Sequence, residues 1–125
     1  MKTKTTLKVL SILMILCFNF HLKAQVPTQK QDSIINTLTE NYTQKLVLTG
    51  KQEVIFKEKL QSYYLEKETL RKEMRGENKL KALYDLGKQE DGAMRNVLTQ
   101  EQFDLYLRIK PSLQPLEEIS LKKKN

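Results

Sequence analysis

The chain has 125 residues, of which 22 are basic and 15 acidic, so its net charge at pH 7 is +7. Its single cysteine, Cys17, and its single histidine, His21, both lie in the first 24 residues. The rest of the chain therefore has no thiolate nucleophile, no imidazole base and no disulfide, which excludes Cys-His and Ser-His-Asp catalysis there. We expect a protein that is not an enzyme and that uses no metal and no cofactor.

Residues 1–24 have the pattern of a secretory signal. Three lysines near the start precede a mostly apolar run over residues 9–20, and the bond between Ala24 and Gln25 is the expected cleavage point. The alternative is a membrane anchor, but spanning a bilayer takes about 20 apolar residues and this run is too short. The sequence therefore predicts that the mature chain is exported.

Removal of the signal lowers the net charge of the chain. The lysines of residues 1–24 account for four of the basic residues, which leaves 18 basic and 15 acidic residues and a net charge of +3. Lys122, Lys123 and Lys124 at the C-terminus account for that remainder. A basic excess confined to a signal and a tail does not form the basic face of a nucleic-acid binder. We expect no nucleic-acid partner.

The mature chain, about 100 residues long, is enough for one domain. Leu, Glu, Lys and Gln dominate it, no proline occurs between Pro27 and Pro111, and no segment shows sustained strand alternation, so the fold is expected to be all-α. In chain order we expect a loose lead-in over residues 25–31, a helical domain over 32–110 and an irregular basic tail over 111–125.

The helical domain is expected to be a small bundle of about four helices arranged as two hairpins. Apolar residues recur at helical spacing in the first two helices, as expected for helices that pack against partners. The four helices are expected over residues 32–47, 50–75, 77–97 and 100–110. The apolar stripe of the first consists of Ile35, Leu38, Tyr42 and Leu46, and that of the second of Phe56, Leu60, Tyr63, Leu70 and Met74.

Glycine and proline set the expected helix ends. Gly76 is expected to stop the second helix, because glycine is the usual C-terminal cap. Gly87 and Gly92 weaken the third helix, and we expect a break or bend near residues 89–92. Pro111 is expected to end the fourth helix.

The five-residue pattern Leu-Thr-x-x-Gln occurs twice, at residues 48–52 and 98–102. Threonine followed three residues later by glutamine is a capping box: the hydroxyl accepts from the third helical N–H, and the glutamine side chain accepts from the N–H of the threonine. Such a threonine stabilises its helix by about 1 kcal/mol. The pattern thus predicts two helix starts of the same construction, and a purely structural role explains all its residues, Leu48, Thr49, Gln52, Leu98, Thr99 and Gln102.

An exported, helix-rich chain with two such motifs resembles the Spy/CpxP-type periplasmic proteins, the LTxxQ-motif family, over residues 42–108. The resemblance implies an antiparallel helical hook that pairs with a second copy, a homodimer, to form a shallow cradle. Members of the family act as ATP-independent chaperones, modulate an envelope-stress sensor, or bind zinc in metal stress. This chain carries Gly50 at the first helical position and lacks the histidine and cysteine that a zinc-responsive relative would use.

The expected function is therefore that of a periplasmic holdase that binds unfolded or partly folded envelope proteins. The alternatives are a regulatory accessory protein that docks on a membrane sensor of envelope or metal stress, and a structural interaction module. Tyr63 and Tyr64 also allow two interpretations. They form part of a client-contact face with the surrounding basic residues, or Tyr63 lies in the core and Tyr64 at a helix or dimer border.

Overall fold

The computed structural model describes residues 25–115. The expected signal, its cleavage residue Ala24 and the basic end of the expected tail, including residues 122–124, lie outside the described residues. Within residues 25–115 the regular elements are all helices, as predicted: α2 (Gln29–Leu46), α3 (Gly50–Glu73), α4 (Gly76–Arg95) and α5 (Gln100–Leu113). None of these helices is long and apolar enough to cross a membrane.

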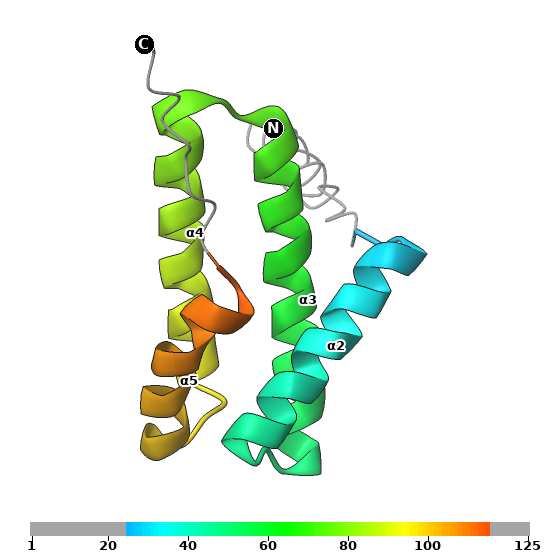
Figure 1. Cartoon of the computed structure of the whole chain (residues 1–125), viewed down its shortest axis with the longest axis vertical. Coiled ribbons are helices and arrows are strands. Elements are labelled where there is room, and N and C mark those ends of the chain that lie inside the picture. The colour runs from blue at the N-terminus through cyan, green and yellow to red at the C-terminus, as the bar shows by residue number, and fades with distance from the viewer. Residues whose placement is uncertain (1–24, 116–125) are drawn as a thin grey trace, which may run out of the picture.

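The four helices form a small bundle (Figure 1). The longest pair, α3 and α4, lie side by side and antiparallel, and α2 packs on α3 while α5 packs on α4. The helices α2 and α5 also contact each other near the end of the α3–α4 pair that is far from its connecting turn. This is the predicted arrangement of two hairpins, α2–α3 and α4–α5.

An aromatic core lies where the two hairpins meet. Tyr42 of α2, Phe56 of α3 and Tyr106 of α5 are fully buried. Their ring centroids are 5.1 Å apart for Tyr42 and Phe56, 5.5 Å for Tyr42 and Tyr106, and 6.2 Å for Phe56 and Tyr106. Rings at these separations and tilts attract each other in addition to the surface they bury. Leu60 and Met94, also fully buried, extend this core onto α3 and α4.

The start of α2 differs from the prediction. Residues 29–31 are helical, because Thr28 and Gln31 form a third capping box with the same spacing as the two Leu-Thr-x-x-Gln motifs. The preceding residues are also in contact with the bundle, since the Gln25 side chain donates a hydrogen bond to Thr69 Oγ1 of α3 at 3.3 Å. The expected loose lead-in over 25–31 is therefore wrong for its second half.

The connection between α3 and α4 also corrects the prediction. The helix α3 ends at Glu73, and Gly76 is the first residue of α4 rather than the stop of α3. The backbone of Gly76 has a φ of +61°, which glycine adopts without strain, so a glycine is needed at this turn. No break occurs near residues 89–92, because α4 runs without interruption to Arg95.

The helix α5 continues past Pro111 to Leu113, three residues beyond the predicted end. Proline removes one backbone N–H, and the next turn still closes because the Gln114 N–H donates to the Lys110 carbonyl at 2.7 Å. Side chains of this last turn contact the other helices, as described below. The predicted irregular tail is therefore helical over residues 111–113.

Candidate functional site

The two Leu-Thr-x-x-Gln motifs meet in space. Gln52 Nε2 donates to Gln102 Oε1 at 2.8 Å, and Gln102 Nε2 donates to Gln52 Oε1 at 3.1 Å. Both glutamines also complete their own capping boxes, because the N–H groups of Thr49 and Thr99 donate to Gln52 Oε1 and Gln102 Oε1, each at 3.0 Å. The predicted caps are confirmed, and the pairing between them is an additional finding.

Each glutamine also bonds the loop of the opposite hairpin. Gln52 Nε2 donates to the Val97 carbonyl at 3.1 Å, and Gln102 Nε2 donates to the Leu46 carbonyl at 3.2 Å. Leu46 is the last residue of α2 and Val97 lies in the loop just after α4, and backbone acceptors at such places lack helical partners. Leu48 and Leu98 are buried beside them. We call the six motif residues the motif junction: it fixes the α2–α3 hairpin to the α4–α5 hairpin, and its two threonine hydroxyls are used as helix caps.

A second polar group lies inside the bundle, centred on Glu90 of α4, which is only 1% exposed. Its Oε1 accepts from Gln114 Nε2 at 3.2 Å, and its Oε2 lies 3.1 Å from Lys110 Nζ and 3.8 Å from Lys67 Nζ. Lys110 Nζ also donates to Asp91 Oδ1 at 2.6 Å. A buried carboxylate of this kind is tolerated only with such partners. We call these five residues the Glu90 cluster.

Two core tyrosines extend the Glu90 cluster to the remaining helices. The Tyr42 hydroxyl donates to Gln114 Oε1 at 2.8 Å, and the Tyr106 hydroxyl donates to Asp91 Oδ1 at 3.3 Å. Burial, and secondly the nearby Glu90 charge, raise the pKa of both phenols well above the ordinary value. Both phenols therefore stay protonated, and the cluster joins all four helices at the end of α5.

Lys67 is the least satisfied member of this cluster. Burial lowers the pKa of its ammonium, the charge of Glu90 opposes that effect, and the charges of Lys110 and Arg71 add to it. Its only contact with an anion among the described residues is the 3.8 Å approach to Glu90, and it donates no hydrogen bond to them. The side chain is 16% exposed, so solvent reaches it.

The sequence analysis missed Glu90 as a special residue, although a signal for it was present. Glu90 stands four residues after Leu86 and four before Met94, and both Leu86 and Met94 are buried. An acid in the middle of a buried stripe must be paired in the interior, since an isolated buried charge is too costly. The identity of its partners, on α3 and α5, is a tertiary feature that this spacing does not reveal.

Two adjoining recesses open beside the Glu90 cluster. The larger, which we call the α4–α5 groove, has a volume of about 320 Å³, and the smaller, the basic pocket, has about 60 Å³. The groove is lined by Leu83, Tyr84, Gly87, Lys88, Asp91, Leu107, Lys110, Pro111 and Gln114. The basic pocket is lined by Lys67, Arg71, Leu83, Gly87, Lys110, Gln114 and Pro115. Because four residues line both, the two recesses are neighbours.

Comparison with known proteins gives no guide to these recesses. No family model, no curated protein and no solved structure matches this chain. Its function is therefore inferred from the residues and their geometry.

The two candidate tyrosines lie elsewhere on α3. Tyr63 and Tyr64 are both half-buried, and the core position beside them is taken by Leu65 instead. Burial raises the pKa of the Tyr64 phenol, and the Glu68 carboxylate adds to that effect. Neither tyrosine lines the α4–α5 groove or the basic pocket. Their role in client contact stays a prediction.

The described residues also bear on metal binding. Within residues 25–115, no group of three or more acidic, histidine or cysteine side chains is arranged to hold a metal ion. The two acids closest together in the site, Glu90 and Asp91, are both engaged by Lys110.

Proposed function

We propose that this chain is an exported, Spy/CpxP-like helical protein that acts as an ATP-independent periplasmic holdase and works as a homodimer. The observation that carries the proposal is the paired Leu-Thr-x-x-Gln motif, because both copies cap a helix and bond to each other through Gln52 and Gln102. A chance capping box would have no reason to meet a second copy across a junction of two hairpins.

The α4–α5 groove supplies a surface that suits weak contact with unfolded segments. Tyr84 is 59% exposed and Leu107 is 42% exposed, so both present apolar surface to solvent beside the recess. Lys88 Nζ lies 5.5 Å from the centroid of the Tyr84 ring, which places a cation next to that surface. An apolar recess with mixed charge at its border favours early encounter and short-lived binding.

A catalytic role is not proposed, because the acids of the site are already occupied. Glu90 is buried beneath Lys110 and Gln114, and Asp91 accepts from Lys110 and Tyr106. Glu90 is only 1% exposed, which keeps a substrate away from it, and Asp91 is held by a cation and a phenol, so neither is placed to exchange a proton with a substrate.

An aggregation assay tests the proposal. The purified mature chain, without ATP, should suppress the light scattering of a chemically denatured client on dilution when present in stoichiometric amounts. Leu107→Ser should weaken the suppression, because it removes apolar surface from the groove. Val54→Ser is the matched control, since Val54 is 69% exposed on α3 and lies outside both recesses. No suppression at equal concentration, or equal loss in both variants, would count against a holdase that uses this groove.

The alternative, an accessory protein docked on a membrane stress sensor, is favoured by the small size of the groove, which fits one defined partner segment. It predicts a single stoichiometric partner that co-purifies from envelope extracts. The homodimer is checked by measuring the mass of the purified chain in solution.

A further inference from the structure

The starting point is the ammonium group of Lys67. It reaches solvent at the basic pocket, its nearest anion is Glu90 Oε2 at 3.8 Å, and it donates no hydrogen bond to the described residues. Glu90 Oε2 lies closer to Lys110, at 3.1 Å, so Lys67 shares an anion that is already paired. An ammonium has three donors, and those of Lys67 are available to a further acceptor.

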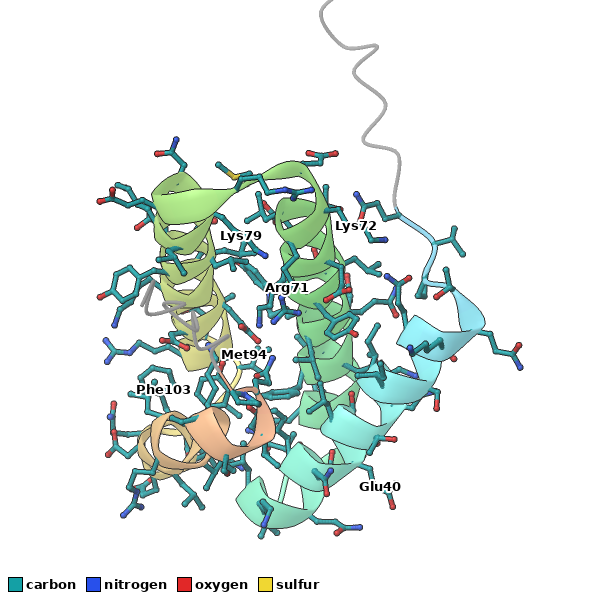
Figure 2. All side chains as sticks on the ribbon, turned by 45° about the horizontal axis from the view of Figure 1, so that its top comes forward. Glu40, Arg71, Lys72, Lys79, Met94 and Phe103 are labelled. Carbon is teal, nitrogen blue, oxygen red and sulfur yellow. The ribbon has the colours of Figure 1, made fainter. Side chains whose placement is uncertain are left out.

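Cations dominate the walls of the same pocket. Lys67, Arg71 and Lys110 line it, and no acid is among its lining residues. Figure 2 shows Arg71 extending from α3 into the space between α3 and α4. Arg71 Nη1 donates to Glu68 at 2.6 Å, and Lys110 pairs with Glu90 and Asp91, but none of these three acids lines the pocket. A group entering the pocket therefore meets cations and no carboxylate among its lining residues.

The groove next to the basic pocket is mainly apolar. Leu83, Tyr84, Leu107 and Pro111 line it, and Leu83 also lines the pocket. The two recesses thus place a carboxylate-sized basic pocket of about 60 Å³ beside an apolar recess of about 320 Å³. This combination is complementary in charge and shape to a chain segment that carries an acid beside a bulky apolar residue.

We propose that the basic pocket binds the side-chain carboxylate of an aspartate or glutamate in an extended segment of a partner protein, with Lys67 as its main ligand and the neighbouring apolar residue of that segment in the α4–α5 groove. The proposal rests on the holdase function and names the client chemistry. A side-chain carboxylate is the source favoured, because acids occur throughout an unfolded chain whereas a C-terminal carboxylate occurs once.

Fluorescence anisotropy with two labelled peptides tests this directly. The first peptide is Gly-Ser-Leu-Glu-Phe-Leu-Ser-Gly, and the second has glutamine in place of glutamate. The mature chain should bind the glutamate peptide about fivefold to tenfold more tightly than the glutamine peptide, as expected for a partly buried charged hydrogen bond. Lys67→Gln should abolish that preference, because it removes the charge that the carboxylate would meet.

Lys72→Gln is the matched control. Lys72 is exposed on the same helix, lies on the side of α3 away from α4 (Figure 2), and lines neither recess. This variant makes the same change in net charge as Lys67→Gln but leaves the basic pocket intact. It should therefore keep the preference for glutamate. Thermal unfolding followed by circular dichroism checks that Lys67→Gln stays folded, and the comparison of the two peptides on the unchanged chain needs no variant at all.

Three results would overturn the proposal. The first is equal affinity of the unchanged chain for both peptides, and the second is an equal loss of preference in the two lysine variants. The third is binding that occurs only after Glu117→Gln and Glu118→Gln are introduced, which would make the chain's own carboxylates, close after Pro115 in the sequence, the occupants. The assay contains no aggregating client, so it and the holdase assay can fail independently.

Discussion

Phe56→Ala should lower the free energy of unfolding by about 3–5 kcal/mol, the range measured for truncating fully buried aromatic residues. Phe56 is completely buried, and its ring contacts the rings of Tyr42 and Tyr106 at the meeting point of α2, α3 and α5. The substitution leaves a cavity at that point and removes two ring contacts. Because a domain of this size has a total stability of only about 5–10 kcal/mol, much of the variant should be unfolded at 37 °C.

Urea unfolding followed by circular dichroism measures this effect. Val54→Ala, two residues away on the same helix, is the control, because Val54 is 69% exposed and its truncation should change the transition little. A Phe56→Ala variant with the midpoint of the unchanged chain would contradict the aromatic core described above.

Glu90→Ala should lower the free energy of unfolding by about 3 kcal/mol, because removing one partner of a buried ion pair leaves the others uncompensated. Lys67 would lose its ion pair with Glu90, and Gln114 would lose its acceptor. The last turn of α5 depends on these contacts, so its backbone amides should also exchange hydrogen faster.

Asp85→Ala is the matched control for this prediction. Asp85 lies on the same helix and pairs with Lys81 at 2.7 Å, but both side chains of that pair are largely exposed. Exposed ion pairs contribute little, so this variant should unfold near the midpoint of the unchanged chain. Equal midpoints for the two variants, measured in urea, would show that Glu90 is not a buried structural charge.

Local features of this chain were predictable from its sequence. The starts of α3 and α5 were correct because a capping box depends only on residues three positions apart, and Thr49 and Thr99 satisfy that pattern without help from the rest of the fold. The start of α2 was missed although Thr28 and Gln31 have the same spacing. In the predicted stripe on α2, Ile35, Tyr42 and Leu46 are buried and Leu38 is partly buried against the core. In the stripe predicted for α3, Phe56 and Leu60 are buried, but the other three residues, Tyr63, Leu70 and Met74, are only partly buried.

Helix ends were harder to predict because side-chain contacts override local rules. Pro111 favours a stop, but Lys110 and Gln114 on either side of it bond to Glu90 and Asp91, and these contacts keep the last turn of α5 in place. Gly76 favours a helix end as well, and its positive φ instead forms the turn from which α4 begins.

The candidate site was the least predictable part of the molecule. The basic pocket is built from α3, α4 and the residues around the end of α5, and no spacing within one helix indicates that Lys67 and Lys110 share Glu90. The pairing of Gln52 with Gln102 is likewise a contact between residues fifty positions apart, and the motif predicts the two caps without predicting that they touch.

A double-mutant cycle at Gln52 and Gln102 tests most directly whether the two motifs act as one junction. Each single change to alanine removes the bond between the side chains, and each also removes a cap and a bond to a loop carbonyl. If the glutamines are coupled, the double variant should be more stable than the sum of the two single losses predicts, by about 1 kcal/mol. Additive losses in urea unfolding would contradict the junction and would leave two independent helix caps.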